Sequence, residues 1–199
     1  MKVEQFVMAY RVEQDRLRAM LPEGFASLRP VLRINVEIRT NTEESVYLEF
    51  NTPVAAHGKR GWLNIAHWES DTTNLSYEKT GAVTSFLSPF LDISYTRVGI
   101  VGGCPAEKDN DGCFFLVKTM EFVPTEKIDT NKEFCNCSFA WKFTDGNAHG
   151  ISIDGKSIPA IPTKPKQQYK KQALSPEIAA AIQCEQILGA YAVTFERHK

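Results

Sequence analysis

Apolar and polar positions alternate with a period of two along much of the chain, which is typical of β-strands half-buried in a sheet. The clearest stretch begins at Leu32. Its apolar positions are Leu32, Ile34, Val36 and Ile38, and its polar positions are Arg33, Asn35, Glu37 and Arg39. A polar cluster at 40–43 follows, and the alternation resumes from Val46 to Phe50. These features predict a β-hairpin.

Other short apolar or alternating runs predict further strands. They are Phe6–Tyr10, Gly61–Trp68, Cys113–Val123, Phe134–Phe143 and Ile187–Phe195. Three polar stretches rich in turn residues are expected to be loops or turns, namely Asp71–Gly81, Pro105–Gly112 and Ile158–Lys171. The stretch Phe86–Ile100 stays ambiguous, because Pro89 interrupts it and proline cannot donate to a central ladder.

Two short helices accompany these strands. Glu13–Met20 has apolar residues at helical spacing and is followed by Pro22, which ends the helix. A serine before a proline at 175–176 is a favourable start for a second helix. Many strands with few helices predict a mainly β barrel or sandwich. At 199 residues the chain is expected to form a single domain, 1–199.

Charge and composition exclude several classes of protein. The chain carries 24 acidic and 23 basic residues, so no strong field favours nucleic acid or an anionic membrane. No apolar run approaches the roughly 20 residues of a membrane span. The apolar run near the N-terminus is too short for a signal peptide, so a cytoplasmic location is expected. Five cysteines, an odd number, do not indicate a disulfide framework.

The segment Tyr10–Arg33, YRVEQDRLRAMLPEGFASLRPVLR, resembles the N-terminal region of the acetoacetate decarboxylase family. The matching positions are Tyr10, Arg11, Glu13, Asp15, Leu17, Arg18, Pro22, Glu23, Pro30 and Arg33. A second segment resembles the next hairpin of that family, at Tyr47–Glu49, Pro53-Val54 and Gly58–Gly61. The resemblance implies an antiparallel acetoacetate-decarboxylase-like β-barrel with one or two short helices. It also implies an internal small-molecule pocket and assembly as a homo-oligomer.

The resemblance further implies a chemistry in which a lysine forms an imine with a keto acid. The protonated imine accepts the electrons left behind when carbon dioxide departs. In the family itself, a cationic neighbour and desolvation are known to lower the pKa of that lysine. Without that change the lysine would be protonated at neutral pH and could not attack the carbonyl.

The chain departs from the family pattern at the reactive site. The family motif of G-R-E followed by P-K-K is absent from the sequence, and an ungapped alignment from Gly61 places Ser85-Phe86 at the lysine pair. The nearest lysine is Lys79, which requires a shifted alignment. One pocket glutamate of the family is replaced by Asn35, whereas the second acid is kept as Glu49.

Lys118 is the candidate imine lysine from pattern alone. Its neighbours at a spacing of two are all apolar, namely Phe114, Leu116, Met120 and Phe122. A lysine on such a face, pointing into a barrel, would have its pKa lowered by desolvation. The alternative is an edge position from which the ammonium group reaches water.

The polar face of the first hairpin strand also allows two interpretations. Alternating polar residues usually form the solvated face of a sheet. Within the family resemblance, Arg33, Asn35 and Glu37 instead line the pocket, where the planar fork of Arg33 holds a substrate carboxylate.

Two hypotheses of function remain. In the first, the chain binds a keto acid or a related carboxylate and acts as a lyase, with Lys118 and Glu49 as catalytic residues and Arg33, Asn35 and Glu37 binding the substrate. In the second, it is a non-catalytic ligand-binding or accessory barrel without imine chemistry. An accidental match to a different β-rich fold is a third, weaker alternative. No cofactor is expected, and Cys135 and Cys137 lack the companion ligands that a metal site needs.

Overall fold

The computed structural model describes residues 1–100, 114–116, 121–123, 127–128, 133–144, 148–152 and 168–198. The strands are β1 (Lys2–Arg11), β2 (Ala26–Ser27), β3 (Val31–Thr40), β4 (Glu44–Ala56), β5 (Lys59–Glu69), β6 (Ser76–Thr80), β7 (Val83–Leu87), β8 (Leu91–Ile100), β9 (Phe114–Leu116), β10 (Phe122–Val123), β11 (Lys127–Ile128), β12 (Glu133–Phe143), β13 (Ala148–Ser152) and β14 (Gln186–His198). The helices are α1 (Gln14–Met20) and α2 (Pro176–Ala180). The predicted turn 105–112 lies outside the described residues.

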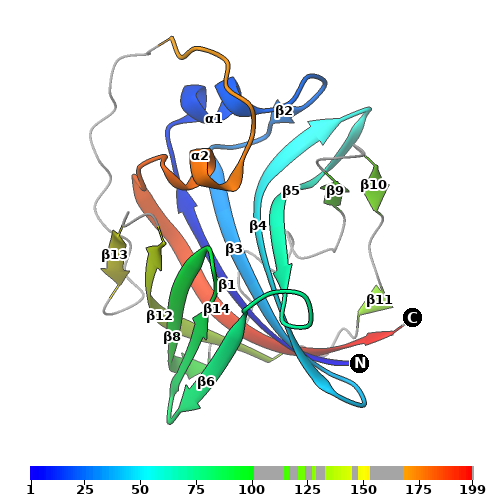
Figure 1. Cartoon of the computed structure of the whole chain (residues 1–199), viewed down its shortest axis with the longest axis vertical. Coiled ribbons are helices and arrows are strands. Elements are labelled where there is room, and N and C mark those ends of the chain that lie inside the picture. Colours follow the sequence, from blue (N-terminus) through cyan, green and yellow to red (C-terminus); the bar gives the residue numbers. More distant parts are fainter. Residues whose placement is uncertain are drawn as a thin grey trace.

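A strongly curved sheet dominates the structure (Figure 1). Its strands follow the order β10-β9-β5-β4-β3-β1-β14-β12-β8-β7-β6. The described pairs are antiparallel except for β5 with β9. Both helices lie at one end of the sheet and both chain ends at the other. The prediction of a mainly antiparallel β fold with two short helices is therefore confirmed, and closure of the sheet into a barrel stays a prediction.

The segment Asp71–Gly81 was expected to be a loop, and that prediction is wrong. Residues Ser76–Thr80 form β6, which pairs with β7 across a turn at Gly81. Gly81 has a φ of 60°, a conformation that favours glycine. Because β6 is an edge strand with mostly exposed side chains, its sequence lacks the apolar alternation that predicts strands.

The ambiguous stretch Phe86–Ile100 contains the end of β7 and all of β8. Pro89 lies in the connection between them, where it interrupts no ladder. The hydroxyl of Ser88 accepts hydrogen bonds from the backbone N–H groups of Phe90 and Leu91 and closes this turn. The serine start of α2 is also confirmed, because Ser175 accepts a bond from the N–H of Ile178.

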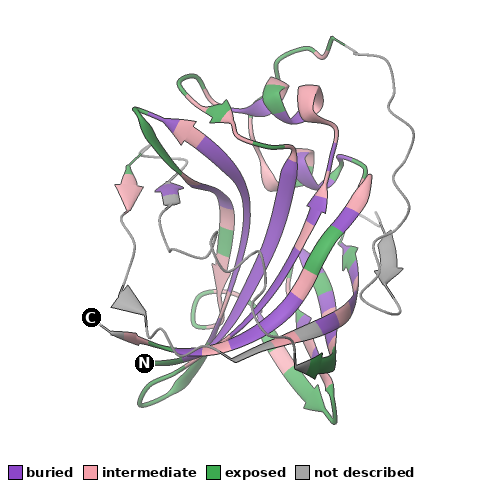
Figure 2. Ribbon diagram, turned by 180° about the vertical axis from the view of Figure 1, so that it is seen from behind, coloured by how far each residue is buried: buried purple, intermediate pink, exposed green. Residues whose placement is uncertain are grey.

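The main hydrophobic core lies on one face of β1, β3 and β4 and is covered by β7, β8 and β12. Buried positions run along the long central strands of the sheet (Figure 2). The four alternating apolar residues of β3, Leu32, Ile34, Val36 and Ile38, all belong to the main core, as the alternation predicts. Aromatic contacts link the two layers, with ring centroids 5.2 Å apart for Phe6 and Phe86 and 4.6 Å apart for Trp68 and Phe90. Each such buried ring contributes roughly 1.5–3 kcal/mol through removal of apolar surface from water.

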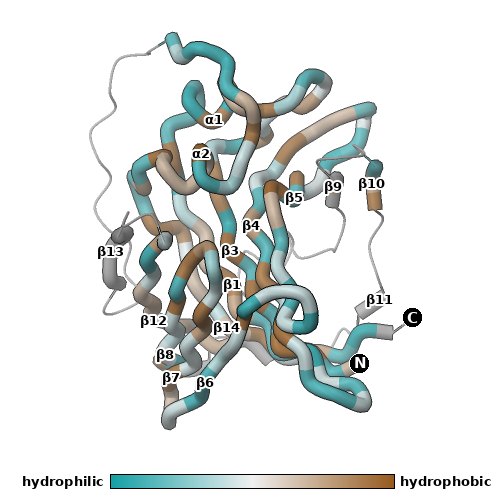
Figure 3. Tube along the Cα trace, viewed as in Figure 1, coloured by the Kyte–Doolittle hydropathy of each residue, from teal (hydrophilic) through white to brown (hydrophobic). Residues whose placement is uncertain are grey.

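Two smaller apolar clusters lie outside the main core. One lies on β1 and β14 and contains Val3, Val7, Tyr191, Val193 and Phe195. The other includes Val54 of β4, Leu63 of β5 and Phe115 of β9. Hydropathy along the trace shows hydrophilic positions interspersed with apolar ones on β3 and β4 (Figure 3). The polar side chains of β3 and β4 alternate with side chains of the main core and therefore lie on the opposite face of these strands.

Candidate functional site

Strand register places the polar side chains of β3, β4 and β5 on one face, which we call the polar face. Arg33 of β3 lies opposite Asn51 of β4, and Asn35 lies opposite Glu49. Asn51 in turn lies opposite Asn64 of β5. Directly opposed residues of an antiparallel pair share a face of the sheet, so these five side chains converge.

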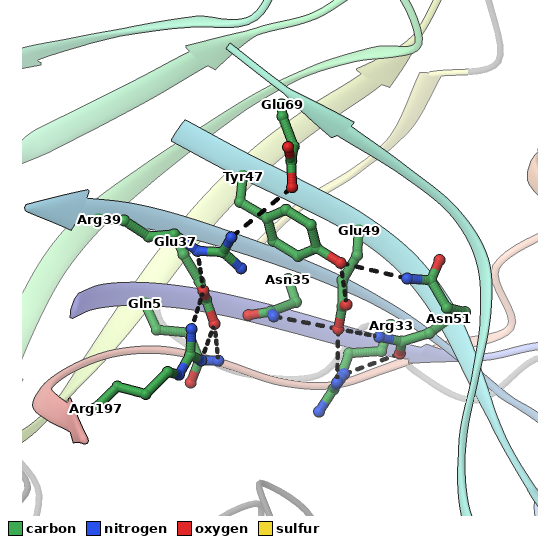
Figure 4. Close-up of polar contacts among 11 residues, drawn as sticks. Gln5, Arg33, Asn35, Glu37, Arg39, Tyr47, Glu49, Asn51, Glu69 and Arg197 are labelled. Atoms are coloured by element: carbon green, nitrogen blue, oxygen red, sulfur yellow. Dashed lines mark hydrogen bonds and ion pairs between the residues drawn. The ribbon is translucent and has the colours of Figure 1, made fainter. Parts of the chain in front are cut away.

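Glu49 is the centre of the first hydrogen-bonded cluster (Figure 4). Its Oε1 accepts bonds from Arg33 Nη2 at 3.1 Å, Asn35 Nδ2 at 3.2 Å and Asn51 Nδ2 at 2.6 Å. Its Oε2 accepts a bond from the hydroxyl of Tyr47 at 2.9 Å. Four donors therefore surround one buried carboxylate and compensate for its loss of water.

Arg33 is held in place on three sides. Its Nε donates to Asn51 Oδ1 at 2.9 Å, and its Nη2 donates to Glu49. Its guanidinium carbon lies 3.8 Å from the ring centroid of Trp62 on β5, which is a cation–π contact. Its Nη1 has no hydrogen-bond partner among the described residues. One arm of a fixed guanidinium fork is therefore available.

Glu37 is the centre of a second cluster on the same face. Both terminal nitrogens of Arg197 donate to its carboxylate, at 3.1 and 2.9 Å, and Arg39 Nε donates at 2.7 Å. Gln5 Nε2 adds a bond at 3.2 Å. Burial alone would raise the pKa of Glu37, but the charges and hydrogen bonds of Arg197 and Arg39 outweigh it and lower that pKa. The Glu37 carboxylate is therefore a fixed negative charge.

Tyr47 joins the two clusters. Its hydroxyl donates to Glu49 and accepts a bond from Asn64 Nδ2 at 3.3 Å. Its ring lies beneath the guanidinium of Arg39 and stacks on His67, with ring centroids 5.8 Å apart. Burial, together with the charge of Glu49, raises the pKa of Tyr47 strongly, so the hydroxyl stays protonated and remains a donor to Glu49.

The alternative that the polar side chains of β3 face solvent is wrong for three of them. Arg33 is 7% exposed, Asn35 4% and Glu37 2%. Asn35 and Glu49 do not point to bulk solvent and instead hydrogen-bond to each other. The structure therefore brings Arg33, Asn35 and Glu49 together, and it places Glu37 two positions along β3 in the second cluster.

Sequence reasoning missed several members of the polar face. Tyr47 and Asn51 flank Glu49 at a spacing of two on β4, so extending the alternation along that strand would have found them. Asn64 and Trp62 share a similar spacing on β5. Arg197 has no local sequence pattern that points to Glu37, since 160 positions separate the two residues.

Neither candidate lysine is found on the polar face among the described residues. Lys118 lies outside the described residues. Lys79 lies on β6 with 45% of its side chain exposed, and its Nζ is 2.7 Å from Glu4 Oε2. Its other contact is with the ring of Tyr77. Neither partner belongs to the polar face, so the structure does not bring Lys79 to Arg33, Asn35 or Glu49.

The described part of the chain contains no group of three histidine, cysteine or acidic side chains arranged to hold a metal ion. Cys137 and Cys184 are free thiols there. Burial raises the pKa of Cys137 to about 12. Over the same residues, no helix is both long and apolar enough to cross a membrane.

Known proteins share this architecture. No protein-family model and no curated protein matches the sequence. Among solved structures, the acetoacetate decarboxylase of Legionella pneumophila is similar, with a TM-score of 0.62 and 12% identity over 98% of this chain and 82% of that chain. The enduracididine biosynthesis enzyme MppR complexed with pyruvate has a TM-score of 0.60 and 10% identity over 98% of this chain and 85% of the enzyme.

An acetoacetate decarboxylase-like enzyme from Sphingomonas wittichii is also similar, with a TM-score of 0.51 and 10% identity over 100% of this chain and 91% of that chain. At such low identity the likeness concerns the backbone, and it extends over nearly the whole chain in each comparison. The curved antiparallel sheet with two short helices is therefore the acetoacetate decarboxylase-like fold.

Proposed function

We propose that the polar face binds a small carboxylate compound, a keto acid or a related acid, with Arg33 as its anchor. The observation that carries this proposal is the buried guanidinium of Arg33, fixed on three sides with Nη1 unpaired among the described residues. A preorganised guanidinium fork suits a carboxylate better than an ammonium group does, because its donors lie in one plane.

Ion pairs balance the charges of the two clusters. The guanidinium groups of Arg33, Arg39 and Arg197 pair with the carboxylates of Glu37, Glu49 and Glu69. The Nη1 donor of Arg33, and not an excess of positive charge, is therefore what would bind the carboxylate of a ligand.

One structural neighbour gives this proposal a precedent. MppR has been solved in complex with pyruvate, a small keto acid. The shared fold makes an equivalent ligand class reasonable for this chain, and the residues of the polar face supply the chemistry. Asn35 would contact the ligand beside Arg33, whereas Glu49 would position both side chains. Contact of Glu37 with the ligand, and assembly as a homo-oligomer, stay predictions.

A lyase acting through a lysine imine is the catalytic form of this proposal. MppR has also been solved with the condensation product of pyruvate and an aldehyde, so reactive keto-acid chemistry occurs in a neighbour. In this chain the catalytic roles of Lys118 and Glu49 stay predictions. The non-catalytic alternative requires only the anchor and its neighbours on the polar face.

Substitution of the anchor tests the proposal. Binding of pyruvate and of propionate is measured by isothermal titration calorimetry and by ligand-observed NMR. Arg33→Lys keeps the charge but removes the planar fork, and we expect roughly tenfold or greater weakening for both acids. Arg39→Lys is the matched control, an arginine on the same strand face whose Nε is already bound to Glu37. Equal affinity of wild type and Arg33→Lys would overturn the proposal.

A further inference from the structure

We infer that the ligand of the polar face carries a hydrogen-bond donor, a hydroxyl or ammonium group, on the carbon next to its carboxylate. This inference rests on the proposed function and narrows its ligand class. The observation behind it is the direction of the hydrogen bonds around Glu49. That direction leaves two amide oxygens on the polar face, of Asn35 and Asn64, as acceptors without a donor.

Glu49 fixes the orientation of the Asn35 amide. An ionised carboxylate can only accept hydrogen bonds, so the group that faces it must be the amide nitrogen. Asn35 Nδ2 makes this contact with Glu49 Oε1 at 3.2 Å. The oxygen of the same amide, Oδ1, therefore points elsewhere and can serve only as an acceptor.

Glu49 also fixes the Asn64 amide, through Tyr47. The hydroxyl of Tyr47 uses its hydrogen to bind Glu49 Oε2, so only its lone pairs remain for a neighbour. Asn64 Nδ2 occupies one of them at 3.3 Å. The oxygen of the same amide, Asn64 Oδ1, therefore points elsewhere and can serve only as an acceptor.

Both of these oxygens are buried without a partner. Asn35 is 4% and Asn64 6% exposed, and neither Oδ1 has a hydrogen bond within the described parts of the chain. Asn51 shows the contrast, because its Nδ2 binds Glu49 and its Oδ1 accepts from Arg33. Buried acceptors are rarely left unpaired in folded proteins, since each one costs free energy. Two of them on one face indicate a missing donor.

The polar face therefore offers one charged donor, Arg33 Nη1, and two acceptors. Arg33 and Asn35 are two positions apart on β3, roughly 7 Å along the strand, a distance that a small acid can bridge together with a hydrogen bond of about 2.9 Å at each end. A keto acid presents only acceptors and would leave Asn35 Oδ1 unpaired. A hydroxy or amino acid matches both kinds of group. Because the two oxygens are enclosed in the ligand-free chain, neighbouring side chains shift as such a ligand enters.

A series of ligands that cannot form an imine tests this inference on the wild-type chain. The donor-bearing acids are lactate, with a hydroxyl, and alanine, with an ammonium group. The matched acids are 2-fluoropropionate, in which fluorine replaces the hydroxyl without donating, and propionate. We expect lactate or alanine to bind at least tenfold more tightly than both matched acids in calorimetry. Whichever of the two binds more tightly identifies the donor.

Two variants locate the effect. Asn35→Ala and Asn64→Ala each remove an unpaired acceptor, and we expect at least one of them to reduce the preference for the donor-bearing acid to within twofold. Asn51→Ala is the matched control, because both ends of its amide are already paired within the protein. It should weaken all four acids together and keep the preference. Thermal melting establishes which variants fold. The ligand series on the wild-type chain tests the inference even if a variant does not fold.

The outcomes separate this inference from the function on which it rests. If all four acids bind with equal affinity, or 2-fluoropropionate binds more tightly than lactate and alanine, the inference is overturned and carboxylate binding stands. If none of the four binds at millimolar concentration but pyruvate does, the inference is overturned and carboxylate binding stands; if pyruvate does not bind either, both fail. If the preference survives in both Asn35→Ala and Asn64→Ala, the donor is recognised elsewhere and the inference is also overturned.

Discussion

The guanidinium carbon of Arg39 lies 3.9 Å from the ring centroid of Tyr47, and this contact joins the two charged clusters of the polar face. Arg39 binds Glu37 on one side, whereas Tyr47 binds Glu49 on the other. The two buried carboxylates are therefore linked through a single pair of side chains. Loss of the Tyr47 side chain should therefore affect both clusters.

Tyr47→Phe tests the contribution of the Tyr47 hydroxyl. The substitution keeps the ring but removes the donor to Glu49 and the acceptor for Asn64. We expect the free energy of unfolding to fall by about 1–3 kcal/mol, because polar groups are left unpaired in a buried place. Tyr77→Phe is the control, since its hydroxyl binds Glu44 at an exposed position and its loss should cost about 0.5 kcal/mol or less. Urea unfolding measures both, and equal losses would contradict the expectation.

Stability should fall in acid through Glu37. The pKa of this carboxyl is lower in the folded chain than its ordinary value of 4.5. Its contribution to stability is therefore complete above about pH 4.5 and is lost as the pH falls through the lowered pKa. Glu37→Gln should destabilise the chain by about 3 kcal/mol at pH 7, because it leaves buried guanidinium groups without their counterion.

The same variant gives the control for the pH effect. Wild type and Glu37→Gln are unfolded in urea at pH 7 and again at pH 3. The difference between their free energies of unfolding should shrink at the lower pH, because protonation of Glu37 then favours the unfolded wild-type chain, whereas the variant has no group there to titrate. A difference that stays constant between the two pH values would show that Glu37 does not titrate as the structure indicates.

Borohydride trapping tests the imine. Incubation with acetoacetate or pyruvate and borohydride should add the mass of the reduced ligand to one lysine if this chemistry exists. Peptide mapping is expected to locate it at Lys118 ahead of Lys79, which lies on the exposed edge strand β6 and pairs with Glu4. Lys118→Met should abolish the adduct and Lys79→Met should not. The absence of an adduct with a panel of keto acids, or labelling scattered over surface lysines, would contradict imine chemistry.

Cys137 should resist alkylation in the native chain. Its thiol is buried, and a pKa of about 12 leaves almost none of it as the reactive thiolate at pH 8. Iodoacetamide at pH 8 should modify it only after unfolding in guanidinium, which mass spectrometry of the peptides can follow. Rapid modification of Cys137 in the native chain would show that β12 opens readily.

Much of the fold follows from local patterns in the sequence. The alternation in β3 gave the correct faces for its side chains, because the main core and the polar face differ sharply in character. β6 was missed because an exposed edge strand has no apolar face to reveal it. Burial of the polar face could not be decided from β3 alone. It depends on groups from β1, β4, β5 and β14, which the register brings together.

The partners of the site residues were harder to predict for the same reason. Glu49 and Asn35 came from a resemblance in sequence, whereas the clamp on Glu37 requires Arg197 from the last strand. Charge, size and distance along the chain say nothing about which arginine reaches which carboxylate. That information lies in the antiparallel pairing of β1 with both β3 and β14.

This pairing has a consequence for how the protein is made. β1 and β14 lie side by side, and Lys2 is opposite Glu196. During synthesis, β1 and β3 emerge early, whereas β14 leaves the ribosome last of the described strands. Until then, the open edge of β1 exposes unpaired backbone groups next to the apolar run Phe6–Met8, a combination that invites misassociation between nascent chains. The Glu37 cluster therefore forms only after β14, which supplies Arg197, has paired with β1, and chaperone protection of β1 should matter most before that pairing.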